Sequence, residues 1–276
     1  MLEHHRPSPS RRARRSIVAV AVAALLATAF ASPAAAQSPG PKSKPTIVLV
    51  HGAWADGASW ARVTERLQAQ GYPVLAVPNP LRGLSSDAAY LGAFLKDHTS
   101  GPVVLVGHSY GGAVITSAAA SDPDVEALVY VNAFVPDRGE SLLGLLSSEG
   151  PVDTSIFEAV AYPGGSGDVD LYVKASVFPS AFANDLSPAT AKQLAAAQRP
   201  ITRSALGEQA GAPAWKSLPS WYLLGTADHI ISPSLQEKMA ERAKSKITKV
   251  NASHLSMISQ PRAVEAVITA AARSVR

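Results

Sequence analysis

Six short apolar runs, rich in valine, isoleucine and leucine, alternate with helical patterns along most of the chain. Runs of this continuity are typical of parallel strands that are buried on both faces. Strands that alternate with helices predict a doubly wound, mostly parallel α/β sheet of about six strands. The predicted strands span residues 46–50, 74–77, 103–106, 127–131, 221–224 and 247–250.

The segment from Pro136 to Lys216, about 80 residues, interrupts this alternation. It contains Gly164-Gly165-Ser166-Gly167, scattered prolines and short helical pieces, but no strand pattern. A structureless loop of such length is uncommon in a compact domain. Residues 136–216 are therefore predicted to form a helical cap inserted between two parts of one sheet domain, residues 46–135 and 217–276.

The first 36 residues have the three parts of an export signal: an arginine-rich start, an apolar run from Ile17 to Ala31, and the cleavage site Ala34-Ala35-Ala36. The apolar run is near 15 residues long, whereas a bilayer span needs about 20, which disfavours a membrane anchor. We expect cleavage before residue 37, a linker over residues 37–45, and export to the periplasm or the medium. Arg14-Arg15 also fits a twin-arginine signal, so two export routes stay open.

The formal charge of +4 lies in this leader. Subtracting its five arginines and one glutamate from the 25 basic and 21 acidic residues leaves 20 of each. The mature chain therefore offers no basic surface for nucleic acid. The chain also has no cysteine, which excludes disulfides, a thiol nucleophile and thiolate metal ligands.

Gly107-His108-Ser109-Tyr110-Gly111 directly follows a predicted strand and precedes an alanine-rich helical stretch. This context is typical of a nucleophile elbow, a sharp strand-to-helix turn that presents a serine hydroxyl at the carboxyl end of the sheet. A dinucleotide-binding turn would instead need a glycine at position 109 and an acidic residue after the next strand, where the chain has Asn132. Ser109 is the predicted nucleophile.

A nucleophilic serine needs a neutral imidazole as its base and a carboxylate that orients the imidazole. His254 is the predicted base because it follows the last predicted strand, and Asp228 is the predicted acid because it follows the strand before. The resulting chain order Ser, Asp, His is that of a nucleophile-elbow enzyme. Asp137 is the rival acid. The remaining histidines are interpreted as structural, exposed or poorly placed: His51, His98, His108 and His229.

The oxyanion of an acyl-transfer intermediate needs two fixed amide donors. The predicted donors are the backbone amides of Ala53, after the first strand, and of Tyr110, after the nucleophile. No metal or cofactor is expected. Apolar residues in or beside the cap are candidates either for the wall of a substrate pocket or for the core of the cap itself: Phe134, Leu142, Leu145, Phe178 and Phe182.

With these motifs the chain resembles the α/β-hydrolase superfamily from Thr46 to the last helix. More closely, it resembles the group that holds plant methylesterases, hydroxynitrile lyases and bacterial esterases. The motifs that carry this likeness are His51-Gly52-Ala53-Trp54, the elbow, Gly225-Thr226-Ala227-Asp228 and Ser253-His254-Leu255-Ser256-Met257. The resemblance implies an α/β-hydrolase fold and a serine esterase that acts on a small to medium carboxylic ester.

Lyases of this group usually carry threonine at the place of Gly52 and lysine at the place of Leu255, so both residues favour ester hydrolysis. Lyase chemistry, lactone or amide cleavage, and a non-catalytic binding module are the alternatives.

Overall fold

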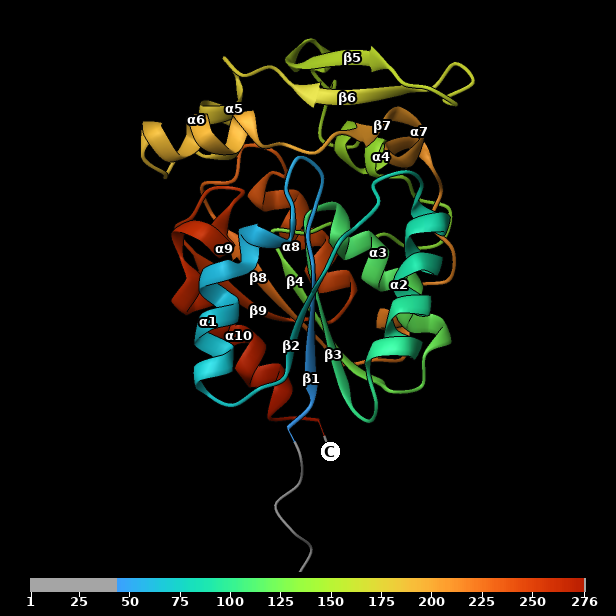
Figure 1. The fold of residues 1–276 in the computed structure, drawn as a ribbon, viewed down its shortest axis with the longest axis vertical. Coiled ribbons are helices and arrows are strands. Elements are labelled where there is room, and N and C mark those ends of the chain that lie inside the picture. Colours follow the sequence, from blue (N-terminus) through green and yellow to red (C-terminus); the bar gives the residue numbers. More distant parts are fainter. Residues whose placement is uncertain (1–43, 276) are drawn as a thin grey trace, which may run out of the picture. The chain divides into compact units, whose positions relative to one another are not determined.

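The computed structural model describes residues 44–275, which fold around one parallel sheet (Figure 1). The sheet has six strands in the order β2-β1-β3-β4-β8-β9, so the predicted doubly wound architecture is confirmed. From β1 the chain goes to β2 on one side and then to β3 on the other, which makes the β1–β3 boundary the switch point where such sheets place their sites. The strands are β1 (Thr46–Val50), β2 (Val74–Val77), β3 (Val103–His108), β4 (Val125–Val131), β8 (Ser220–Gly225) and β9 (Lys246–Val250).

Burial differs between the central and the outer strands. Every residue of β3 and β8 is buried, whereas β2 and β9 are partly exposed along most of their length. The prediction that these runs are buried on both faces is therefore wrong for the two edge strands. An edge strand has a neighbour on only one side, so its flank and parts of its faces reach solvent.

Helices cover both faces of the sheet. α1 (Ala61–Ala69) and α10 (Pro261–Ala272) pack together on one face, and α2 (Leu84–His98) and α3 (Tyr110–Ala118) pack together on the other (Figure 1). α8 (Pro233–Arg242) lies against β8 and β9. α10 buries the apolar stripe that its helical spacing predicts, made of Val264, Val267, Ile268 and Ala271.

The cap lies over the carboxyl ends of the strands (Figure 1). It contains helices, as predicted, but also a three-stranded antiparallel sheet, so the prediction of a purely helical cap is wrong. Its helices are α4 (Leu142–Ser147), α5 (Phe178–Phe182), α6 (Pro188–Ala196) and α7 (Arg203–Gly207). Its strands are β5 (Phe157–Ala161), β6 (Val169–Val173) and β7 (Ile201–Thr202).

The sequence did not predict the cap strands because their apolar pattern is weak. None of the residues of β5 is fully buried, and β7 has only two residues. The glycine-rich stretch between β5 and β6 supplies the hairpin turn, with Gly164, Ser166 and Gly167 at positive φ. Pairing with a neighbour in space, rather than a local apolar run, makes these residues strands.

Four short 3₁₀ helices and one further α-helix complete the described elements. They are η1 (Gly57–Trp60), η2 (Ala119–Ser121), η3 (Thr154–Ile156), η4 (Ala214–Lys216) and α9 (Ser256–Ser259).

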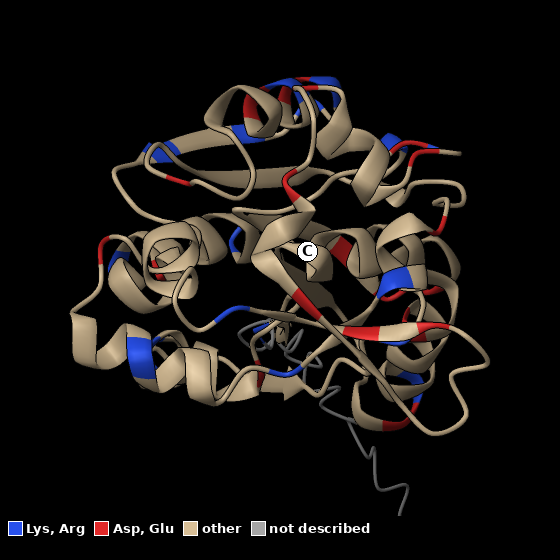
Figure 2. Cartoon of the chain, turned by 90° about the horizontal axis from the view of Figure 1, so that it is seen from above, with Lys and Arg blue, Asp and Glu red and all other residues tan. Residues whose placement is uncertain are grey.

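The predicted leader, residues 1–36, and most of the predicted linker lie outside the described residues. Between residues 44 and 275 no helix combines the length and the apolar character needed to cross a bilayer. Seen from above, basic and acidic residues are interspersed over helices and loops rather than gathered by sign (Figure 2).

Candidate active site

Ser109 occupies a strained turn between β3 and α3. Its φ of 52° and ψ of −122° are uncommon for a residue with a side chain. The flanking glycines allow the turn, since a Cβ on Gly107 would lie 2.5 Å from the carbonyl oxygen of Gly111, and a Cβ on Gly111 would lie 2.5 Å from that of Val50. The carbonyl of Ser109 accepts hydrogen bonds from the amides of Gly112 at 3.0 Å and Phe134 at 3.1 Å, which hold the turn in place.

Three predicted residues meet in a hydrogen-bonded chain above the strand ends. His254 Nε2 lies 2.9 Å from Ser109 Oγ, and His254 Nδ1 lies 2.8 Å from Asp228 Oδ2. All three are buried, with 3%, 1% and 3% of the surface of Ser109, His254 and Asp228 exposed. They come from the start of α3 and from the loops after β8 and β9, so a parallel sheet brings together residues that are far apart in sequence.

The Asp228 carboxylate has five hydrogen-bond donors. Oδ1 accepts from the amides of Ile230 at 2.8 Å and Ile231 at 3.0 Å. Oδ2 accepts from Asn132 Nδ2 and Gln236 Nε2, each at 3.0 Å, as well as from His254. These donors replace the water that a buried carboxylate loses. The bond to Asp228 places the imidazole proton on Nδ1 and leaves the Nε2 lone pair facing Ser109.

Asn132 and Gln236 are functional candidates that the sequence interpretation missed. Asn132 directly follows β4 and has a φ of 45°, a conformation that asparagine tolerates better than most residues. Its amide contacts Asp228, and its Oδ1 accepts from Ser256 Oγ at 2.5 Å, so it links the loops after β8 and β9. The sequence signal that could have identified Asn132 is its place as a polar residue directly after a buried strand. The rival acid Asp137 is partly exposed and pairs with Lys216, away from this chain.

Two other histidines are buried beside the site. His108 Nε2 donates to the carbonyl of His254 at 2.9 Å. His51 Nδ1 donates to the carbonyl of Gly52, and its Nε2 accepts from the amide of Asn79, both at 2.9 Å. Burial lowers the pKa of His51 to about 4, and burial together with the nearby His254 lowers the pKa of His108 well below its usual value. Both rings are neutral supports at neutral pH.

The other two histidines, His98 and His229, do not bind Ser109 or Asp228 through their rings. His98 is exposed at the end of α2. His229 donates through Nδ1 to the carbonyl of Ser180 at 3.0 Å and does not contact Asp228 through its ring. In residues 44–275 no three His, Asp or Glu side chains gather in a way that could hold a metal ion.

Ala53 and Tyr110 both line the cavity at Ser109. In the part of the chain that the structure describes, neither backbone amide donates to another protein group. Tyr110 begins α3, so its amide also lies at the positive end of that helix dipole. Its phenol donates to the buried Asp87 at 2.8 Å, which fixes the residue. The two amides are thus available to an oxygen atom bound beside Ser109.

A cavity of about 590 Å³ opens onto Ser109 between the sheet and the cap. Phe134, Leu142 and Phe182 line it, as the sequence interpretation proposed for a pocket wall. Further apolar lining comes from Trp54, Leu143, Leu146, Val152, Ile156, Phe157, Ala181, Leu206, Ile230 and Leu235.

Leu145 and Phe178, the other two pocket candidates, are not among the residues that line this cavity. Leu145 faces a hollow between α4 and α8. Phe178 stacks on Phe182 with ring centroids 5.1 Å apart and faces a small hollow beside Leu255. Leu145 thus lies toward α8, and Phe178 packs against Phe182, so neither lines the cavity at Ser109.

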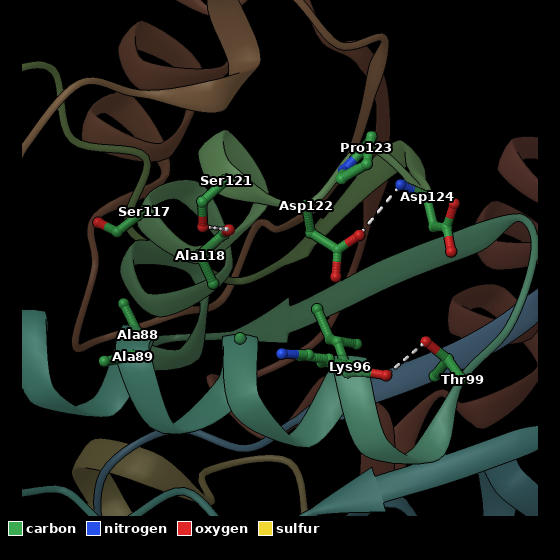
Figure 3. Close-up of a pocket in the computed structure, with 12 residues that line it drawn as sticks. Ala88, Ala89, Lys96, Thr99, Ser117, Ala118, Ser121, Asp122, Pro123 and Asp124 are labelled. Atoms are coloured by element: carbon green, nitrogen blue, oxygen red, sulfur yellow. Dashed lines mark hydrogen bonds between the residues drawn. The ribbon is translucent and has the colours of Figure 1, made fainter.

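A second hollow of about 590 Å³ lies between α2 and the segment after α3 (Figure 3). Its lining comes mostly from small and polar residues, and some of its polar groups are paired locally. Asp122 accepts from the amide of Asp124 at 3.0 Å, and Thr99 donates to the carbonyl of Leu95 at 2.8 Å. It contains no residue of the Ser109 chain. Volume alone therefore does not identify the site, whereas the lining does.

The comparison with known proteins assigns the chain to a family. The model of the "Alpha/beta hydrolase family" matches residues 47–267. The chain belongs to this family. The resemblance and the fold that the motifs predicted are thereby confirmed.

The chain is 38% identical over 121 residues to the carbendazim hydrolyzing esterase of Nocardioides sp. (strain SG-4G). The matched region covers 40% of this chain and 50% of that protein. It is 34% identical over 114 residues to Methylesterase 2 of Arabidopsis thaliana, covering 36% and 43% of the two chains. Half or less of each relative's length is therefore matched. The crystal structure of polyneuridine aldehyde esterase superposes with a TM-score of 0.72 at 20% identity over 83% of this chain and 99% of that one, which shows a common fold.

The neutral buried histidines predict a pH-dependent stability. The unfolded chain protonates histidine near pH 6.5, while the pKa of folded His51 is about 4. Between these values the unfolded state binds more protons, so the free energy of unfolding falls as the pH falls. Replacing His51 with asparagine should make this fall shallower by up to about 1.4 kcal/mol per pH unit, the limit for one full proton. Urea unfolding of both proteins from pH 6.5 to pH 5 measures the difference, and equal slopes would contradict it.

Proposed function

We propose that the chain is a serine hydrolase that cleaves neutral carboxylic esters of small to medium size. The observation that carries the proposal is the buried chain from Ser109 through His254 to Asp228, with its hydrogen bonds of 2.9 and 2.8 Å. The arrangement of a nucleophile, a base and an orienting carboxylate supports acyl transfer. The esterase names of two relatives agree with this activity.

In the first step, Ser109 Oγ attacks the ester carbonyl while His254 Nε2 takes the hydroxyl proton. Asp228 keeps the imidazole in the required tautomer and stabilises the imidazolium that forms. The carbonyl oxygen becomes an oxyanion, which the amides of Ala53 and Tyr110 stabilise. His254 then gives its proton to the leaving alcohol, and the acyl group stays on Ser109.

In the second step, water attacks the acyl group. His254 accepts a proton from the water and returns it to Ser109 Oγ as the acid leaves. Protonation of His254 would block the first step, because an imidazolium has no lone pair for the serine proton. The neutral His51 and His108 place no competing positive charge beside the base.

The cavity lining favours uncharged substrates. Apolar side chains form most of the wall, and the ionisable side chains besides His229 and the phenol of Tyr110 are the acids Glu149, Asp153 and Asp228. No lysine or arginine is among the lining residues of this described cavity. A substrate carboxylate would therefore lose its water without gaining a cation, which costs several kcal/mol. A volume of about 590 Å³ suits a small to medium organic ester.

Lyase chemistry is the first alternative, and the geometry at Gly52 argues against it. A Cβ at this position would lie 2.7 Å from the Cβ of Ser109 and 2.9 Å from the carbonyl oxygen of His108. The threonine that lyases of the group usually carry here has no room on this backbone. Release of cyanide from a mandelonitrile-type substrate would support the lyase alternative.

Lactone or amide cleavage would use the same groups, and a panel of esters, lactones and amides separates these activities. A binding module without catalysis is the third alternative. Covalent labelling of Ser109 by a fluorophosphonate probe would contradict that alternative, since only an activated serine reacts readily.

We also propose that the protein is exported. The support is the leader sequence: the arginine-rich start, the apolar run 17–31 and the alanines at 34–36. N-terminal sequencing of the protein secreted by its host tests the cleavage before Gln37.

Replacing Ser109 with alanine should lower kcat for ester cleavage at least ~10³-fold, because it removes the nucleophile. The fold should be retained, since alanine is smaller and only one hydrogen bond is lost. Initial rates with a chromogenic ester measure the effect, and circular dichroism is the control. Substantial ester cleavage by the variant would refute the role of Ser109.

A matched pair of substrates tests the preference for neutral esters. A dimethyl dicarboxylate and its half-ester differ by one carboxylate, and kcat/KM for the half-ester should be at least about 100-fold lower. The half-amide of equal length is the uncharged control and should resemble the diester. Equal rates for diester and half-ester would show that the pocket accepts an anion.

A further inference from the structure

The cap contacts the loops that carry Asp228 and His254 at two places. Glu149 accepts from Ser232 Oγ at 3.2 Å at the far end of the Asp228 loop. Residues 180–185, which we name the strap, reach both loops close to Asp228 and His254. The strap comprises the end of α5 and the residues before α6. Because the strap belongs to the cap and the two loops belong to the sheet domain, its contacts connect the wall of the pocket with the reacting groups.

Two strap contacts reach the loop of the acid. Asn184 Nδ2 donates to the carbonyl of Ala227 at 3.1 Å, one residue before Asp228. The carbonyl of Ser180 accepts from His229 Nδ1 at 3.0 Å, one residue after Asp228. The acid is thus bracketed by bonds to the cap on both sides along the chain.

Two further contacts reach the loop of the base. The carboxylate of Asp185 accepts from the amide of Ser253 at 3.0 Å and also from the hydroxyl of Ser253. The ring of Phe182 meets the imidazole of His254 edge to face, with centroids 5.4 Å apart. One exposed cap carboxylate therefore holds both donors of the residue that precedes the base.

This contact matters because the loop between β9 and α9 has no regular structure of its own to fix it. On its inner side, Ser253 is held through its carbonyl, which accepts from Asn132 Nδ2 at 3.3 Å. On its outer side, it is held by Asp185. The placement of the imidazole between Ser109 and Asp228 depends on this loop, and displacements of about 1 Å at a reacting group can cost about 100-fold in rate.

We propose that Asp185 is a positioning residue for His254: by holding Ser253 from the cap, it sets the imidazole in line between Ser109 and Asp228. The consequence for rate rests on the proposed function. The same bond makes the position of the base sensitive to the position of the cap, which also forms the wall of the substrate pocket.

The chain offers a matched control within the cap. Asp168 binds Ser204 in the same manner, accepting from its amide at 3.2 Å and from its hydroxyl at 2.5 Å. This second carboxylate–serine clamp lies between β6 and α7 and neither lines the cavity at Ser109 nor touches the loops of Asp228 and His254. Asp168→Ala removes an equivalent clamp that does not contact the loop of the base.

The experiment compares Asp185→Ala with Asp168→Ala in the purified protein, because an asparagine could keep both hydrogen bonds. Asp185→Ala should lower kcat at least about tenfold and leave KM within about twofold, since the pocket is unchanged. Asp168→Ala should leave kcat within about twofold. Adding Ser253→Ala to Asp185→Ala should cause little further loss, because both changes break the same contact. Thermal unfolding of each variant measures the structural cost.

A second readout does not depend on activity. The hydrogen-bonded proton between His254 Nδ1 and Asp228 gives a downfield proton NMR resonance, assigned by its absence in His254→Gln. It should broaden or shift in Asp185→Ala and persist in Asp168→Ala. If the wild type cleaves no ester, the proposed function fails, while this comparison still decides the role of Asp185. An unchanged resonance and kcat in Asp185→Ala, or equal losses in both variants, would overturn the proposal.

Discussion

The site depends on the burial of the Asp228 carboxylate among five donors. A charge in such a place is stable only when hydrogen bonds replace its water. Those donors come from the end of β4, from α8 and from the loops after β8 and β9. The carboxylate therefore fixes the relative positions of elements distant in sequence, and the orientation of His254 toward Ser109 follows from it.

The sheet domain and the cap contribute different parts of the site. The strand ends supply Ser109, Asp228 and His254, held by backbone turns that tolerate little change. The cap supplies most of the apolar wall, and no lysine or arginine is among the described lining residues. The strap joins the two, because its bonds reach the residues beside Asp228 and His254. The wall of the cavity and the loop of His254 are thus connected through a few polar contacts.

The predictions were correct where residues close together in the sequence determine the local structure. Continuous apolar runs predicted the six strands, and the closely spaced glycines around Ser109 predicted the elbow, since both depend on neighbours along the chain. The cap sheet was missed because β5 is largely exposed and β7 is too short to show a pattern. Asn132, directly after β4, and Gln236, within α8, were missed because their bonds to Asp228 form only when the chain is folded, and no local pattern indicates them.

The sequence by itself predicted a doubly wound sheet of about six strands, the serine turn, and candidates for a base and an acid after the last two strands. Only the tertiary structure decided that Asp228, rather than Asp137, lies within 2.8 Å of His254. It also decided which apolar cap residues face the cavity and that Asp185 binds beside the base. Burial and hydrogen bonding between residues far apart in sequence depend on how elements pack, and no local pattern records that packing.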